Sequence, residues 1–215
     1  MNLGDLRAGL VSLINRDDMT TAQANTFIAQ GMQRLQRELR IPSMERLTIW
    51  NGVGSTAAVL SSIPIPPNLI QPIDLLWRND GSAPGYVQGD LIALDKVSFR
   101  SLQGLPASGV PRAYGRYQAS FYMRGVIPAT SELHLYYYGE FSSLVDDTSE
   151  NEIMASAPDL VTYGALALAG DYFNHPKVND WEARYGQYRD AVALMAVDID
   201  ANGGPMSVAS SHGDY

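Results

Sequence analysis

Helical periodicity at both ends of the chain, with a different pattern between them, most restricts the folds open to these 215 residues. Residues 181–199 carry apolar side chains at successive spacings of four, three, four, three and four, which is typical of a long amphipathic helix. Residues 3–15 and 21–40 carry similar stripes. Because each apolar stripe must be buried against another element, we expect these helices to pack together although residues 46–145 separate them.

The first two helices have recognisable ends. Thr20 followed three residues later by Gln23 is a capping-box pattern, and Pro42 stops the second helix because the residue before a proline leaves the α region.

A third helix is predicted from Ser156, taken as its N-cap, to about residue 173, with Pro158 in the first turn and Asp159 facing the helix dipole. Asn179 with Glu182 is predicted to cap the last helix. Small residues in the third helix would let a neighbouring helix approach closely: Gly164, Ala165, Ala167, Ala169 and Gly170.

The middle of the chain reads as short strands separated by Gly and Pro, which indicates a β-sandwich or small barrel. We expect the Pro-rich residues 63–67 to lie outside any central strand, and Asn79-Asp80-Gly81 to form a tight hairpin turn. Asp95 is predicted to cap a helical turn that contains Val97 and Phe99.

The predicted fold class is therefore α+β: a four-helix-bundle-like domain with an inserted antiparallel β-sandwich or barrel. The helical domain is assigned to residues 1–45 and 146–202 and the β-rich domain to 46–145. Residues 203–215 are rich in Ser, Gly and Ala and show no period, so we expect a flexible tail that becomes ordered on a partner.

Composition excludes several classes of protein. No run approaches the length of a membrane span, and the N-terminus has neither the basic nor the apolar part of a signal peptide, so we expect no membrane association. The chain has no cysteine, which excludes disulfides, thiol catalysis and zinc–thiolate sites. The net charge of −8 argues against a tight grip on nucleic acid.

This charge is segregated along the chain. Residues 1–50 carry six Arg against five acidic side chains, and residues 51–145 carry six basic against six acidic ones. Residues 146–215 carry twelve acidic against three basic ones, a balance of −9. The acidity therefore belongs to the C-terminal third, where it forms either a particular face or solvated helix surfaces.

Catalytic patterns are missing from the sequence. His134, His175 and His212 belong to no metal-binding spacing, and there is neither a nucleophile elbow nor a phosphate-binding loop. Asp198 and Asp200 lie two residues apart on a helix, so their carboxylates point in different directions. We expect no catalytic residue, no metal site and no cofactor, although a hydrolase using carboxylates from residues 146–200 is the enzymatic alternative.

Two basic patterns deserve comparison. Arg34, Arg37 and Arg40 lie at i, i+3 and i+6 of the second helix, either as a solvated face or as a patch that meets an acidic partner or the DNA backbone. A second set of arginines alternates with tyrosines over residues 112–124, which is more typical of a two-faced strand than of a single-stranded nucleic-acid platform.

Taken in order, several stretches resemble the head-to-tail adaptor (connector) proteins of tailed bacteriophages. They are residues 32–45 (MQRLQRELRIPSME), Pro66, Ile73-Asp74, residues 109–114 (GVPRAY), residues 135–138 (LYYY) ahead of 151–153 (NEI), residues 157–166 (APDLVTYGAL) and the helix with Trp181-Glu182 and Tyr185. Together they cover most of the chain from about residue 20 to about residue 195.

This resemblance implies a structural protein that docks under the portal as a ring, typically of twelve copies. Such a ring extends the DNA channel and carries tail, nozzle or tail-fibre proteins, in the neck of a virion assembled in the host cytoplasm. The β insertion would face outward or toward the tail. DNA would pass through without specific binding. The alternative is a tail-completion protein or another acidic binding module that forms no portal-docked ring.

The resemblance and the residue patterns together give candidate contact residues. Portal or partner contacts are expected from Arg34, Arg37 and Arg40 and from the tail residues Pro205, Met206, Val208 and Tyr215. Subunit contacts are expected from the aromatic residues Tyr136, Tyr138, Tyr163 and Trp181. The acidic residues Asp190, Asp198 and Asp200 are expected to face the channel, where they would repel phosphate.

Overall fold

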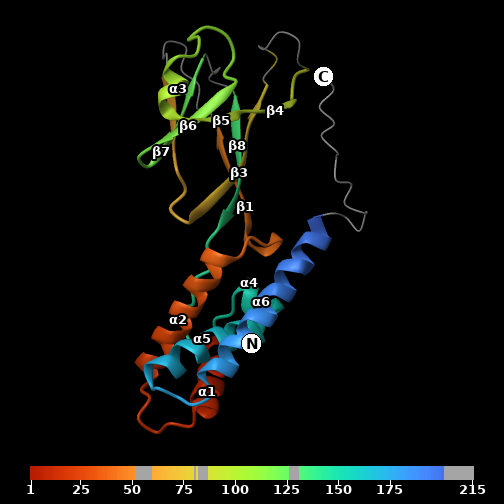
Figure 1. Ribbon diagram of the computed structural model, residues 1–215. Coiled ribbons are helices and arrows are strands. Elements are labelled where there is room, and N and C mark those ends of the chain that lie inside the picture. Colours follow the sequence, from red (N-terminus) through yellow and green to blue (C-terminus); the bar gives the residue numbers. More distant parts are fainter. Residues whose placement is uncertain (52–59, 80, 82–86, 126–130, 201–215) are drawn as a thin grey trace, which may run out of the picture. The chain divides into compact units, whose positions relative to one another are not determined.

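The computed structural model describes residues 1–51, 60–79, 81, 87–125 and 131–200, the last three without their side chains. The chain forms two compact units (Figure 1). Met1–Met44 and the chain from Phe141 onward form the first, here called the helical unit, and Glu45–Glu140 form the second, the β unit. Helices together with mostly antiparallel sheets confirm the predicted α+β class.

The helical unit opens with α1 (Leu3–Ile14) and α2 (Thr21–Glu38). The predicted capping box is present, because Gln23 N–H donates to Thr20 Oγ1 (3.2 Å) and Thr20 N–H donates to Gln23 Oε1 (2.8 Å). A short 3₁₀ turn, η1 (Pro42–Met44), follows the second helix. The buried stripe of α2 consists of Ala24, Phe27, Ile28, Gly31, Met32 and Leu35.

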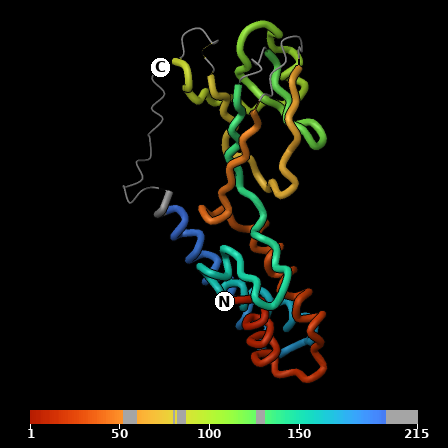
Figure 2. Tube along the Cα trace, turned by 180° about the vertical axis from the view of Figure 1, so that it is seen from behind, coloured from red at the N-terminus to blue at the C-terminus, as the bar shows by residue number. Residues whose placement is uncertain are grey.

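The C-terminal helices are α4 (Glu152–Ser156), α5 (Pro158–Tyr172) and α6 (Val178–Asp200). α5 packs against α1, α2 and α6, so helices from the two ends of the sequence lie side by side (Figure 2). As the small residues of α5 suggested, the approach is close: a Cβ added to Gly31 would lie 3.2 Å from the backbone N of Ala165.

Two predicted caps are wrong. Ser156 ends α4, where its hydroxyl donates to the Glu152 carbonyl, so α5 begins after Ala157 without a side-chain cap and with Pro158 in its first turn. α6 begins at Val178, directly after Lys177, whose N–H donates to the His175 ring, so Asn179 lies inside the first turn.

The β unit contains two four-stranded sheets. The first has the order β1 (Glu45–Asn51), β8 (Glu132–Gly139), β3 (Leu69–Arg78) and β4 (Leu91–Ala93), and all its neighbours are antiparallel. The second has the order β2 (Leu60–Pro64), β7 (Ser120–Arg124), β6 (Ala113–Tyr117) and β5 (Asp95–Val97), with β5 parallel to β6.

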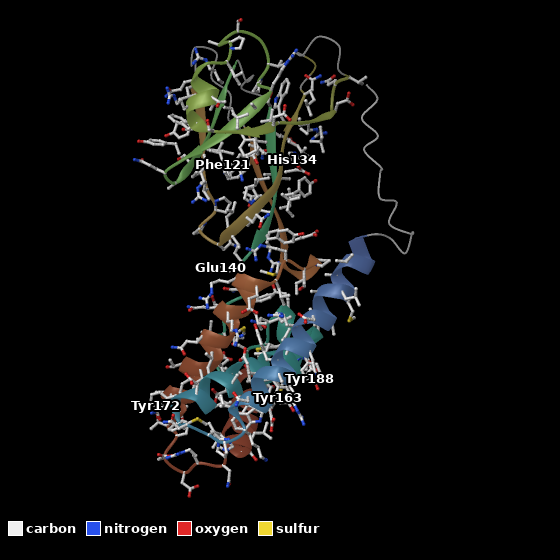
Figure 3. The ribbon with its side chains drawn as sticks, viewed as in Figure 1. Phe121, His134, Glu140, Tyr163, Tyr172 and Tyr188 are labelled. Carbon is white, nitrogen blue, oxygen red and sulfur yellow. The ribbon has the colours of Figure 1, made fainter. Side chains whose placement is uncertain are left out.

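Both sheets contribute to one hydrophobic core. Leu75, Trp77 and Leu135 come from the first sheet, and Phe121 and Met123 from the second (Figure 3). The short helix α3 (Phe99–Gln103) lies over β6. Gly115 permits this, because a Cβ there would lie 3.1 Å from the Phe99 backbone.

Three details of the β unit bear on the sequence predictions. As expected, the Pro-rich segment lies outside the central strands: Ile63 and Pro64 end the edge strand β2, and residues 65–67 follow it. The helical turn assigned to Asp95 is wrong: Asp95 and Val97 belong to β5, and Ser98 caps α3. Asn79 and Gly81 do not close a tight hairpin, because Asn79 exchanges backbone hydrogen bonds with Asp90 and Gly89, and Asp80 lies outside the described residues.

Candidate interaction surfaces

The described histidines, His134 and His175, contact residues close to them. His134 Nε2 lies 3.1 Å from Glu132 Oε2, which also accepts a hydrogen bond from Arg78 at 3.0 Å. His212 lies outside the described residues.

Within the described part of the chain, no group of three or more His, Cys, Asp or Glu side chains could hold a metal ion. In that same part, no helix has the length and apolarity that crossing a membrane requires.

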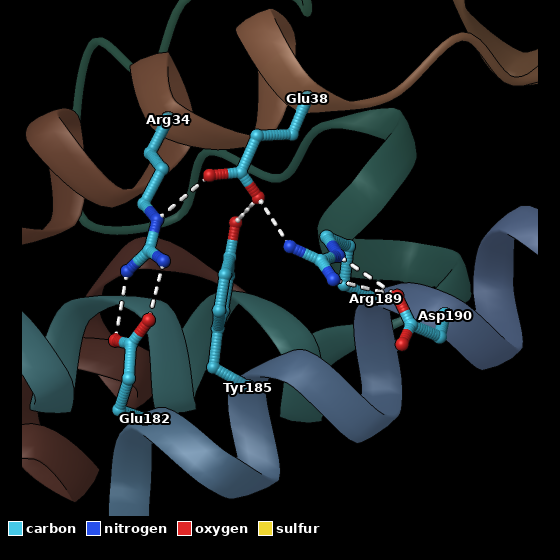
Figure 4. A network of polar contacts seen from close by, with 6 residues as sticks. All are labelled: Arg34, Glu38, Glu182, Tyr185, Arg189 and Asp190. Atoms are coloured by element: carbon cyan, nitrogen blue, oxygen red, sulfur yellow. Dashed lines mark hydrogen bonds and ion pairs between the residues drawn. The ribbon is translucent and has the colours of Figure 1, made fainter. Parts of the chain in front are cut away.

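The most connected polar group of the helical unit joins α2 to α6 (Figure 4). Arg34 makes two hydrogen bonds to the Glu182 carboxylate, at 2.9 and 2.5 Å, and a third to Glu38 at 2.9 Å. Its guanidinium also lies over the Tyr185 ring, 4.1 Å from the centroid. Such a bidentate and stacked geometry orients both helices, because arginine's planar fork fits a carboxylate in one way.

Glu38 is the second centre of this network. Its Oε2 accepts a hydrogen bond from the Tyr185 hydroxyl (2.7 Å) and one from Arg189 (3.3 Å). Arg189 also binds Asp190, at 2.7 and 3.0 Å. Asp190, predicted to face a channel, is well exposed but carries this arginine beside it. Its local field is therefore weaker than that of a lone carboxylate.

Proton affinities in the network follow from these contacts. The hydrogen bonds from Arg34 lower the pKa of Glu182, although partial burial opposes the change. Burial would raise the pKa of Glu38, but hydrogen bonds from Tyr185, Arg34 and Arg189 together hold it below its usual value. Burial, and then the bond to Glu38, raise the pKa of Tyr185.

The network therefore predicts loss of stability in acid. A carboxyl group whose pKa is lowered by folding stabilises the protein above its unfolded value and loses that effect as the pH falls through the folded one. Since the ordinary value for Glu182 is 4.5, Glu182→Gln should lower the melting temperature at pH 7, and this difference should shrink below pH 4.5. Thermal melts of both proteins between pH 7 and 3 measure it, and a pH-independent difference would contradict the assignment.

The predicted arginine patch divides into three different situations. Arg34 is held inside the helical unit by Glu182 and Glu38. Arg40 donates to the Gln36 and Leu39 carbonyls at the end of α2, as a C-terminal cap. Arg37 is exposed, and no contact of its guanidinium with another described residue is seen. Of the three, only Arg37 presents its charge to a partner without first breaking a contact.

The aromatic residues expected at subunit contacts also differ from one another. Trp181 is only 6% exposed and stacks on His175. Tyr163 is half-buried, stacks on Tyr188 with ring centroids 5.5 Å apart (Figure 3), and accepts a hydrogen bond from Arg184. The Tyr163–Tyr188 stack joins α5 to α6 within one chain. Because Trp181 is also buried within the chain, little of its surface is accessible to a second copy.

Tyr136 and Tyr138, in contrast, lie on a broad exposed face. The first sheet turns one side to the core of the β unit, and its other side, here called the outer sheet face, carries several exposed side chains. Exposed large apolar residues on it are Leu47, Ile49, Leu91 and Tyr136. Apart from Tyr136 and Tyr138, the residues of this face were not predicted from the sequence, although the two apolar residues that alternate with Thr48 in β1 were a usable signal.

α6 ends in a second exposed apolar surface. Trp181 and Tyr185 are buried as the periodicity predicted, but Met195 is 63% exposed, beside Leu194 at 65%. α6 has 23 residues and α5 only 15, so α6 extends beyond its neighbour. The expectation that the whole apolar stripe of α6 is buried is therefore wrong for this last part.

Some of the predicted contact residues lie outside the described part of the chain. They are the Asp198 and Asp200 side chains and the tail residues Pro205, Met206, Val208 and Tyr215.

Comparison with known proteins identifies the kind of scaffold to which these surfaces belong. A search of curated proteins finds no match. The model of the SU10 adaptor protein family, in contrast, matches residues 1–209. An adaptor family is structural rather than enzymatic, and its members are phage particle components that contact other head or tail proteins. Since the match extends over both units, the chain belongs to the SU10 adaptor protein family.

Proposed function

We propose that this protein is a head-to-tail adaptor that docks on the portal as a ring, extends the DNA channel and provides a platform for tail or nozzle proteins. The observation that carries the proposal is the family match over residues 1–209. In the connector proteins that the sequence resembles, the ring typically has twelve copies. Such a ring would lie in the neck of the virion, which is assembled in the host cytoplasm. Each copy then needs two different contact surfaces that close by rotation.

The distribution of charge supports a conduit for DNA. Residues 146–215 carry a balance of −9, whereas the rest of the chain is nearly neutral. Acidic side chains along a channel repel phosphate, so DNA would pass without being held. Asp190, Asp198 and Asp200 are the proposed channel residues, on the long helix α6.

Mass measurement tests the proposal directly. The purified chain is examined by native mass spectrometry and negative-stain imaging, alone and with the portal protein of its phage. A ring that forms on the portal is the expected result. A chain that stays monomeric and ignores the portal would favour the alternative, a tail-completion protein or other acidic binding module.

Arg37 offers the cleanest test of portal contact on α2. Reversing the charge of all three arginines in the predicted patch would break the ion pairs of Arg34. Arg37→Glu, in contrast, reverses one exposed charge and leaves those pairs in place. We expect Arg37→Glu to weaken docking at least tenfold, while the melting temperature falls only slightly, because an acidic side chain in the last turn of α2 opposes the helix dipole. Arg100→Glu, an exposed charge reversal on α3, is the matched control. If both variants dock like the wild type, Arg37 belongs to a solvated face.

A further inference from the structure

The edge strands of the two sheets in the β unit differ in the residues that they carry. In the second sheet, β2 ends at Pro64 and β5 carries the charged pair Asp95 and Lys96. Prolines and charges of this kind prevent an edge from pairing with another chain. In the first sheet, the edge strands β1 and β4 instead present apolar residues, and no other described strand pairs with their free sides. β4 is short, with three residues, and β1 begins with the charged Glu45 and Arg46, but neither a proline nor a charge interrupts residues 47–50 or 91–93.

Hydrogen bonding shows which residues of β4 face the free side. Leu94 N–H donates to the Leu75 carbonyl, and Asn79 N–H donates to the Asp90 carbonyl. Because backbone groups alternate in direction along a strand, the N–H and C=O groups of Leu91 and Ala93 point away from β3. Leu91 is 45% exposed.

The same alternation can be followed across the sheet to β1. Since Leu75 bonds toward β4, its neighbours on β3 bond toward β8, and in turn Leu135, opposite Leu75, bonds toward β1. Leu135 is opposite Thr48, so Thr48 is used in the ladder, and Leu47 and Ile49 turn their backbone groups to the free side. These two side chains are 48% and 44% exposed.

The two free edges fit one another. All neighbours in the first sheet are antiparallel and there are four strands, so β1 and β4 run in opposite directions. If β4 of one copy lies beside β1 of the next, the antiparallel alternation continues without a break. The residues that would bond, Leu91 and Ala93 on one side and Leu47 and Ile49 on the other, all have side chains on the outer sheet face.

We propose that neighbouring copies join edge to edge, β4 of one beside β1 of the next, with Leu91 opposite Ile49 and Ala93 opposite Leu47. This pairing is head to tail, so it repeats around a ring and extends one apolar outer face across the copies. The inference deepens the proposed function and rests on it, because it requires an assembly of identical chains.

Engineered cysteines test the pairing, since the chain has none of its own. A hydrogen-bonded antiparallel pair has Cα atoms about 5.5 Å apart, which a disulfide can span. Within one chain, β8 and β3 separate the two positions by about 14 Å, too far for a bond. Ile49→Cys and Leu91→Cys chains are prepared separately, mixed under assembly conditions and oxidised.

The expected result is a covalent dimer in the mixture and none in either variant alone. Ile49→Cys mixed with Tyr117→Cys, an exposed position on the central strand β6 of the other sheet, is the matched control. A ring that forms without the mixed dimer overturns the edge pairing and leaves the proposed ring intact. Dimers of Ile49→Cys alone overturn the head-to-tail arrangement. If the wild-type chain never assembles, both proposals fail.

A charge exchange provides a second test that needs no oxidation. Ile49→Lys and Leu91→Glu should each reduce assembly at least tenfold, because each sets a charge against an apolar neighbour. The double variant places lysine beside glutamate at every junction and should recover most of the assembly. Single variants that assemble like the wild type, or a double variant no better than either, would overturn the proposed pairing.

Discussion

Replacing Gly31 with leucine should destabilise the helical unit by about 3 kcal/mol, because α2 and α5 cross in contact there. A Cβ at Gly31 would lie 3.2 Å from the Ala165 nitrogen and 3.3 Å from the Gly164 carbonyl carbon. Both are backbone atoms, which cannot move aside as a flexible side chain can. The two helices must separate, and the network of Arg34 with Glu182 must stretch with them.

Gly9→Leu is the matched control, since a Cβ at Gly9 in α1 meets nothing within 4 Å. There, leucine should stabilise its helix by up to ~1 kcal/mol, because glycine is a poor helix former. Urea unfolding, followed by hydrogen exchange resolved over the two units, measures both changes. Equal effects of the two substitutions would show that the crossing of α2 and α5 is looser than described.

Local patterns were enough to predict the long helices α1, α2, α5 and α6, although not the short helix α4. Short-range patterns predicted the capping box of Thr20 and Gln23, and it is present. They also predicted the burial of Trp181 and Tyr185 in α6, and both side chains are buried. Asp95 was misassigned because the chain changes sheets just before it: Leu94 N–H still bonds β3, while Asp95 N–H bonds Arg112. That exchange depends on residues distant in sequence, which no local pattern records.

The candidate surfaces were harder to predict for the same reason. The spacing correctly places Arg34 and Arg37 on one helix, but Arg40 lies beyond the end of that helix, and the role of each arginine depends on partners elsewhere. Glu182, which holds Arg34, is 148 residues away. The free edge of β1 likewise follows from its place beside β8 and could not be read from its own residues.

Replacing Trp77 with alanine should destabilise the β unit by about 3–5 kcal/mol. Trp77 is fully buried in the core that both sheets share. Its indole N–H has no hydrogen-bond partner among the described residues. Trp77→Phe should therefore cost much less, because it keeps an aromatic ring in the core and leaves no polar partner unsatisfied.

Leu47→Ala is the control on the opposite side of the same sheet. Because Leu47 is 48% exposed, we expect its truncation to cost below ~1.5 kcal/mol in the monomer. Denaturant unfolding of the monomer, with hydrogen exchange to locate the change, compares the three variants. If Leu47→Ala costs as much as Trp77→Ala, the outer sheet face is already covered within one chain, and the apolar residues along the free edge of β1 would not be available to a second copy.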